Sequence, residues 1–137
     1  MAHSQAVQKL TGGGLAPWQA DLALRRLRRD LCSEVPVEEL ARLCGLSRSY
    51  FTRAFKVSMG TPPHRWLVRQ RVQRACEMLE RTSESISLIA LSCGFADQSH
   101  LTRTFQATVG SSPAAWRRRR KAGVASSLAP PGRVMTV

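Results

Sequence analysis

The sequence predicts an all-α fold made of two helix-turn-helix units joined by a long helix. Three observations predict it: apolar residues recur every three to four positions, no run alternates apolar with polar residues as a half-buried strand does, and one stretch of the chain is repeated. The 137 residues are enough for one compact domain or two very small ones, each with a modest core. A large catalytic architecture is therefore not expected.

The repeat becomes visible when residues 37–66 are aligned with residues 86–116. Paired residues lie 49 positions apart at first and 50 positions apart afterwards, because Ala96 is inserted in a turn. Each copy is interpreted as a short helix, a tight turn and a longer helix. The pairs include Leu40 and Ile89, Cys44 and Cys93, Gly45 and Gly94, Phe55 and Phe105, Gly60 and Gly110, Pro63 and Pro113, and Trp66 and Trp116.

The first helix is predicted by Pro17, which suits a first helical position, and by Leu24, Leu27 and Leu31 at helical spacing. Glycine and proline runs mark flexible ends of the chain. The expected organisation is a flexible leader (1–16), a first helix-turn-helix unit (17–63), a linker helix (64–81), a second helix-turn-helix unit (82–121) and a flexible tail (122–137).

Turn and cap residues mark the helices of the two copies. Pro36 suits the first turn of a helix, and Gly45 ends that helix because glycine tolerates the left-handed conformation of a C-terminal cap. The Ser47 hydroxyl can cap the longer helix, and Asp97 is its equivalent in the second copy. Both caps stay aligned despite the inserted Ala96.

The linker helix over residues 64–81 is expected to be about 27 Å long and to hold the two units at a fixed separation. Its apolar stripe is expected to contain Val68, Val72, Ala75 and Leu79. Its arginines suit phosphate contact, solvation or the rim of the core equally well.

The charge balance of the chain points to a polyanionic partner. Lys and Arg number 21 against 9 Asp and Glu, a net charge of +12, which favours nucleic acid, with a membrane surface as the competing polyanion. No run approaches the ~18 apolar residues that span a bilayer, and the first residues lack the apolar stretch of a secretion signal. We therefore expect no membrane partner and a location in the cytoplasm.

Each longer helix has a polar face opposite its core face. In the first copy, Phe51 and Phe55 lie on the core face. Arginine can read guanine, glutamine can read adenine, and threonine offers a methyl and a hydroxyl group to base edges in a major groove. Most polar helix faces are simply exposed to solvent. Here, however, the same residue types recur on the polar faces of both copies in a strongly basic chain, which favours DNA binding. The candidate DNA-binding residues are Arg48, Ser49, Thr52, Arg53 and Lys56 in copy one, and Gln98, Ser99, Thr102, Arg103 and Gln106 in copy two.

The cysteines and histidines carry no signal of catalysis or metal binding. The cysteines lack a C-x-x-C pair and lie at apolar helical positions or helix ends, which favours buried, reduced thiols over a metal site or a disulfide. The histidines are far apart, and we expect no cofactor, no metal and no enzymatic activity. These residues are Cys32, Cys44, Cys76, Cys93, His3, His64 and His100.

The first copy contains LAxxCGLSxSYFxRxFK from Leu40, and the second contains SIxxIAxxCGFxDQSHxTRxF from Ser85. Over about residues 17–118, these strings resemble the two halves of the AraC/XylS DNA-binding domain. The resemblance implies seven helices and a transcription regulator that binds double-stranded DNA sequence-specifically, with recognition helices over residues 47–58 and 97–108. By this resemblance, the base-contacting positions of the family correspond to Ser49, Thr52 and Arg53 in the first copy, and to Ser99, Thr102 and Arg103 in the second.

Two other classes of protein remain as alternatives. A non-specific architectural DNA-binding protein would share the basic charge but would not need matched recognition faces. An effector-binding receptor would need about a hundred further residues before Pro17, where 16 are present. The chain is either a small stand-alone regulator, which Met1 and the loose tail favour, or part of a longer one. We expect the protein to bind DNA as a monomer. The sequence leaves open whether it contacts RNA polymerase, as activators of the family do. It also leaves open whether it activates or represses transcription.

Overall fold

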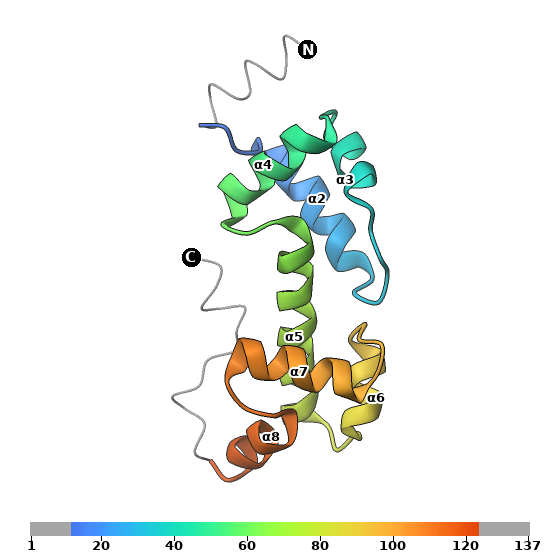
Figure 1. Cartoon of the computed structure of the whole chain (residues 1–137), viewed down its shortest axis with the longest axis vertical. Coiled ribbons are helices and arrows are strands. Elements are labelled where there is room, and N and C mark those ends of the chain that lie inside the picture. The colour runs from blue at the N-terminus through green and yellow to red at the C-terminus, as the bar shows by residue number, and fades with distance from the viewer. Residues whose placement is uncertain (1–11, 124–137) are drawn as a thin grey trace. The chain divides into compact units, whose positions relative to one another are not determined.

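The structure is a computed structural model that describes residues 12–123, and every regular element in that range is an α-helix (Figure 1). The predicted all-α class and its seven helices are confirmed for these residues. In chain order the helices are α2 (Pro17–Arg29), α3 (Val37–Leu43), α4 (Arg48–Met59), α5 (Pro63–Arg81), α6 (Ile86–Ser92), α7 (Gln98–Val109) and α8 (Pro113–Lys121).

The chain divides into two compact units between Leu67 and Val68, a boundary that lies inside α5. The start of α5 therefore packs in the first unit and its remainder in the second, where we expected a linker helix separate from both. We call residues 12–67 the first unit and residues 68–123 the second unit.

The first unit buries its core between α2, α3, α4 and the start of α5. Phe51 and Phe55 have no exposed surface, as their spacing on one helix face predicts. Their ring centroids lie 5.7 Å apart, and Phe55 meets the edge of Trp66 at 6.4 Å. Leu27 of α2 and Leu40 of α3 belong to the same cluster.

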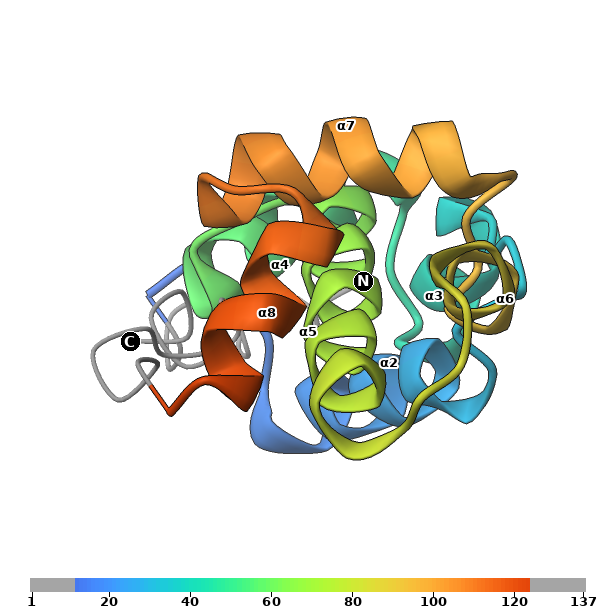
Figure 2. The same cartoon turned by 90° about the horizontal axis from the view of Figure 1, so that it is seen from below.

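The second unit repeats this plan, with α6, α7 and α8 on three sides of the C-terminal part of α5 (Figure 2). Phe105 is fully buried and meets Trp116 at 6.1 Å, edge to face, as Phe55 meets Trp66. On α5, the predicted Val72, Ala75 and Leu79 are buried together with Cys76, which the predicted stripe left out. Val68 of that stripe is half-buried.

The turn between the two helices of each repeat has the same backbone hydrogen bonds. Gly45 (φ 68°) and Gly94 (φ 92°) take the left-handed conformation that L side chains rarely adopt. The Leu46 amide donates to the Ala41 carbonyl at 2.9 Å, and the equivalent bond in the second unit, from Phe95 to Ala90, is also 2.9 Å. This Schellman motif ends the short helix, so the glycine predicted to end it does so in both repeats.

The predicted helix caps are present at the start of both longer helices. The Ser47 hydroxyl accepts a hydrogen bond from the Tyr50 amide at 3.2 Å, and the Asp97 carboxylate accepts one from the His100 amide at 2.8 Å. Helices α4 and α7 therefore begin one residue after these caps, at Arg48 and Gln98.

A buried glutamine, which sequence reasoning missed, ties α2 to the end of α3. Gln19 is 2% exposed, and its side-chain oxygen accepts a hydrogen bond from the Ala16 amide at 2.8 Å. Its side-chain nitrogen donates to the Cys44 carbonyl at 3.0 Å. Because both polar atoms of the amide are paired, the burial of Gln19 costs little.

Two local expectations differ from the structure. The leader was expected to reach Ala16, but Leu15 and Ala16 are buried, so packing begins before Pro17. The first helix ends at Arg29, ahead of Leu31, where the Asp30 side chain accepts hydrogen bonds from the following turn. The remainder of the leader, with His3, and the tail from residue 124 onward lie outside the described residues.

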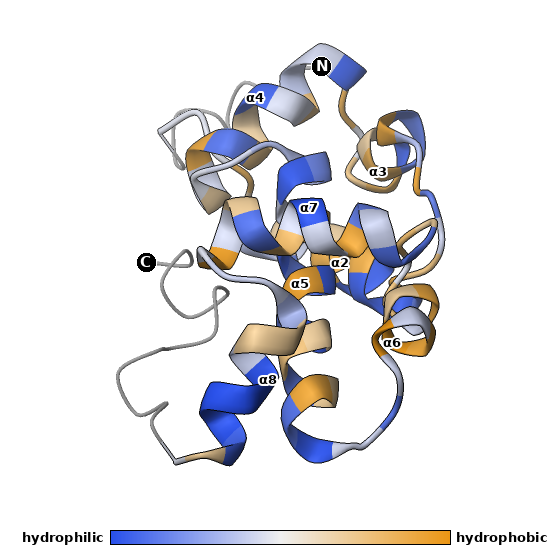
Figure 3. Cartoon of the chain, turned by 60° about the horizontal axis from the view of Figure 1, so that its bottom comes forward, coloured by the Kyte–Doolittle hydropathy of each residue, from blue (hydrophilic) through white to orange (hydrophobic). Residues whose placement is uncertain are grey.

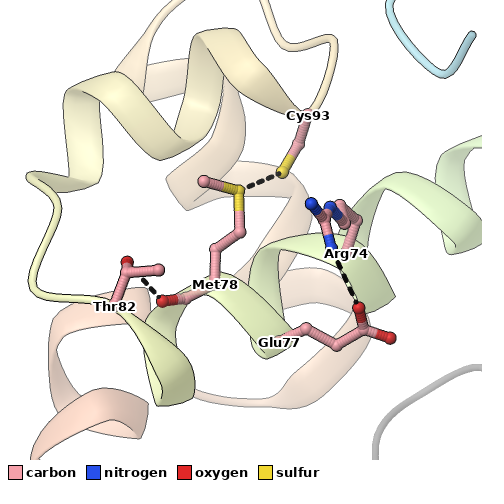
Figure 4. A network of polar contacts seen from close by, with 5 residues as sticks. All are labelled: Arg74, Glu77, Met78, Thr82 and Cys93. Carbon is pink, nitrogen blue, oxygen red and sulfur yellow. Dashed lines mark hydrogen bonds and ion pairs between the residues drawn. The ribbon is translucent and has the colours of Figure 1, made fainter.

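The cysteines follow the expectation except at one position. Cys44, Cys76 and Cys93 are buried, whereas Cys32 is exposed in the turn after α2. The Cys93 thiol lies 3.8 Å from the Met78 sulfur, and the two side chains face each other (Figure 4), so the thiol packs as a small apolar group. On the outer side of α5 in the same view, Arg74 pairs with Glu77 at 3.3 Å.

Candidate nucleic-acid interface

The predicted binding residues of the first unit share the outward face of α4. This face is set by packing, because burial of Phe51, Ala54 and Phe55 turns the opposite side of the helix to solvent. Four of the predicted residues are exposed and Thr52 is half-buried; the exposed ones are Arg48, Ser49, Arg53 and Lys56.

The second unit presents the equivalent face of α7 in the same way. Leu101 and Phe105 are buried, and Thr102 is half-buried like Thr52. Leu101 stands where the first unit has Phe51, so the core tolerates a smaller apolar residue there. The exposed residues of this face are Gln98, Ser99, Arg103 and Gln106.

Two residues on these faces also have partners within the protein. The Arg48 guanidinium lies 2.9 Å from a carboxylate oxygen of Glu38, in the first turn of α3. The Thr52 hydroxyl donates to the Arg48 carbonyl at 2.9 Å, which leaves its methyl group and its oxygen lone pairs available for base edges. Glu38 is not among the candidate binding residues predicted from the sequence.

His100 has a structural role on α7. Its Nδ1 accepts a hydrogen bond from the Ala96 amide at 3.2 Å, and its ring meets the edge of Phe95 at 5.2 Å. Ala96, the extra residue of the second copy, is thus held by a side chain from the helix that follows it. The His100 side chain therefore packs within the second unit.

The end of α8 is strongly hydrophilic (Figure 3), and its basic residues form two groups, those bonded within the protein and those exposed. Arg117 donates to the carbonyls of Leu79, Thr82 and Glu84 at 3.0, 3.2 and 2.7 Å. These carbonyls lie at the end of α5 and just beyond it, so Arg117 closes that helix. Arg120 pairs with a glutamate of α5 and lies 4.8 Å from the Trp116 ring centroid. The exposed members are Arg118, Arg119 and Lys121.

Two of the buried thiols, Cys44 and Cys76, are unsuited to nucleophilic chemistry. Burial raises the pKa of Cys44 to about 11 and the pKa of Cys76 to about 12, so both thiols stay protonated near neutral pH. Within residues 12–123, no three His, Cys, Asp or Glu side chains gather as a metal site would require. In the same range, no helix is both long and apolar enough to cross a bilayer.

Comparison with known proteins relates this geometry to a family. Residues 40–119 match the helix-turn-helix domain family. The HTH-type transcriptional activator RhaS of Klebsiella pneumoniae (strain 342) is 35% identical over 74 residues, which are 54% of this chain and 27% of RhaS. The chain spans 21 to 29% of the length of such curated relatives.

Two solved structures are similar over most of the chain. The DNA-binding domain of AdpA, a global transcriptional factor in complex with a target DNA, superposes with a TM-score of 0.69 and 34% identity, covering 80% of this chain and 97% of that one. A Chromobacterium violaceum transcriptional regulator described as having an AraC-type DNA-binding domain gives a TM-score of 0.69 and 28% identity, covering 74% of this chain and 91% of that one.

Proposed function

The chain belongs to the AraC/XylS family of helix-turn-helix transcription regulators, and from this premise we propose that it binds double-stranded DNA sequence-specifically. In this proposal α4 and α7 are the two recognition helices, and each reads one of two adjacent major-groove segments. The structure of AdpA with its target DNA supports double-stranded DNA as the partner.

One observation carries the proposal: Arg53 and Arg103 are exposed at the same position of two separately packed helix-turn-helix units. Each arginine lies one residue after a half-buried threonine and opposite a buried phenylalanine. An arginine on a recognition helix can donate two hydrogen bonds to the O6 and N7 atoms of guanine. A non-specific architectural protein has no need to repeat this arrangement.

The residues around each arginine suggest different base preferences for the two helices. Lys56 of α4 can donate to guanine or to a phosphate, whereas Gln106, its equivalent on α7, suits adenine. Arg48 and Gln98 differ in the same way at the helix starts. The two subsites should therefore differ in sequence.

Selection of binding sites from a random DNA pool tests the proposal directly. Arg53→Ala and Arg103→Ala should each weaken binding to the selected site by about 1 to 3 kcal/mol and relax the preference at one position. Arg118→Ala, on the exposed end of α8, is the matched control and should not change base preference. Equal weakening on selected and random DNA would assign both arginines to phosphates instead, and a pool without any enriched motif would favour the architectural alternative.

A second experiment tests whether one chain reads both subsites. The two units are related by duplication within a chain, so the subsites should run in the same direction and not form a palindrome. Inserting about 5 base pairs between them turns the second subsite to the other face of the duplex and should reduce the affinity to that of one unit. Unchanged binding of a monomer, verified by light scattering, would contradict joint reading.

A further inference from the structure

The ion pair between Glu38 and Arg48 joins the start of α3 to the start of the proposed recognition helix α4. The two charged groups are 2.9 Å apart, and their side chains are 53% and 68% exposed. The backbone at both ends is fixed, because α3 buries Leu40 and Ala41 and α4 begins at the Ser47 cap. The backbone of Glu38 therefore has a defined position at the edge of the proposed DNA-binding face, within reach of Arg48.

We propose that Glu38 is a positioning residue that determines how Arg48 contributes to sequence selection. Glu38 restrains the Arg48 guanidinium for base reading and offsets its charge, so that Arg48 adds little to general attraction for DNA. This inference rests on the proposed function, because it assigns Glu38 a part in the same interface.

Two physical effects lead to this role. An unpaired arginine is attracted to any phosphate, whereas one that already shares its charge with a carboxylate gains less there. The carboxylate also repels phosphates in misaligned complexes, which disfavours wrong sites more than the correct one. In addition, a restrained side chain loses less conformational freedom when it meets a base.

The second unit lacks this pair, although its backbone plan is the same. Ser87 stands at the position of Glu38, and Gln98 stands at the position of Arg48. Ser87 is exposed and carries no charge. The repeat thus provides an internal reference in which both members of the pair are replaced by neutral residues.

The variant Glu38→Gln tests the proposal through two effects of opposite sign. Affinity for random duplex should rise, and the slope of log affinity against log salt should steepen by about 0.9, since one more cation is available to phosphates. The ratio of selected-site to random-site affinity should fall by about fivefold to tenfold, the range of one weakened base contact. A ratio that stays unchanged would overturn the proposal.

The control variant Asp21→Asn removes another exposed ion pair of the first unit. Asp21 pairs with Arg25 at 3.0 Å on α2, with side chains 55% and 76% exposed. The change in formal charge is the same as in Glu38→Gln, but the released arginine lies outside α4. An equal fall of the affinity ratio in both variants would show a general charge effect and overturn the role of Glu38.

A double-mutant cycle separates positioning from folding. In an Arg48→Gln background, Glu38→Gln should have no further effect on the affinity ratio, because the side chain it positions is absent. A persistent effect, or a melting temperature that falls together with the ratio, would mean that Glu38 acts through the fold, which would also overturn the proposal.

The reciprocal experiment installs the pair in the second unit. Ser87→Glu combined with Gln98→Arg should create a new base preference at the matching position of the second subsite. Gln98→Arg alone should mainly raise the affinity for random duplex, with a smaller change in the ratio of selected-site to random-site affinity. No new preference would count against the proposal. Failure of the proposed function is distinct, because the unaltered protein would then select no motif at all.

Discussion

The two units share a backbone plan and a core, but they differ in how their ends and exposed helices are held. Both bury a phenylalanine against the edge of a tryptophan, and both end the short helix at a left-handed glycine. In the first unit, Gln19 ties an additional helix to the helix-turn-helix; in the second, Arg117 closes α5 instead. Duplication kept the positions that pack and cap, while the ends of each unit acquired their own polar contacts.

The short helices show the same contrast on the surface. α3 carries Glu38, Glu39 and Arg42, whereas the equivalent residues of α6 are Ser87, Leu88 and Leu91. Leu88 and Leu91 are 45% and 55% exposed. Both helices bury an apolar pair at equivalent positions, Leu40 and Ala41 in α3 and Ile89 and Ala90 in α6, so the exposed side of the short helix differs between the units without any change of fold.

The largest effect is expected from the shared aromatic core. Phe55→Ala and Phe105→Ala should each destabilise their unit by about 3 to 5 kcal/mol, because each removes a fully buried ring that packs on a tryptophan. Hydrogen exchange should show the loss in the altered unit first. Phe51→Leu, which imports the residue of the second unit, should cost less than about 1.5 kcal/mol. Simultaneous loss of protection in both units would show that α5 makes them one cooperative body.

The next effect is specific to the second unit. Arg117→Ala removes the side chain that donates to three carbonyls at the end of α5, and unfolding in denaturant should show a loss of about 1.5 to 3 kcal/mol. The first unit has Leu67 at the equivalent position, so no such contact exists there. Arg118→Ala, at the exposed neighbour, should leave stability unchanged. Equal stability of both variants would mean that water replaces Arg117 at these carbonyls without cost.

A smaller effect should be the same in both units. Gly60 and Gly110 end α4 and α7 with φ values of 78° and 92°, and a Cβ would meet no atom within 4 Å at either position. Alanine should therefore cost only the strain of the left-handed conformation, about 1 to 2 kcal/mol in each unit. Asparagine tolerates this conformation and should cost less. Melting temperatures that differ between the two alanine variants would show that one turn relaxes.

Near neutral pH the smallest effect is that of the thiols, because they change the free energy of unfolding only at alkaline pH. Burial raises the pKa of Cys44 to about 11 and that of Cys76 to about 12 from an ordinary value of 9.0. Above pH 9 the unfolded chain releases these protons while the folded chain retains them, so stability should fall as the pH rises from about 9. Cys32, which is exposed, should react with an alkylating reagent at pH 8 before the other three thiols. Equally fast alkylation of Cys44 in the folded protein would contradict its burial.

Local signals were enough to predict most of the fold. The caps at Ser47 and Asp97, the helix-ending Gly45 and the start of the first helix at Pro17 depend on residues within one or two turns, so their chemistry can be read along the chain. The repeat added the pairing of core positions. The outward direction of the candidate binding residues followed from the same periodicity, since burial of one helix face exposes the other.

The amino-acid sequence by itself thus determined the helices, their caps, the repeated cores and the face of each longer helix that meets solvent. Only the tertiary structure decided which polar groups meet across the chain: Gln19 with Cys44, Arg117 with Leu79, and Glu38 with Arg48. The first two contacts join residues 25 and 38 positions apart. Side chains of this kind carry no periodic signal, because their partners are set by how helices pack and not by what precedes or follows them in the chain.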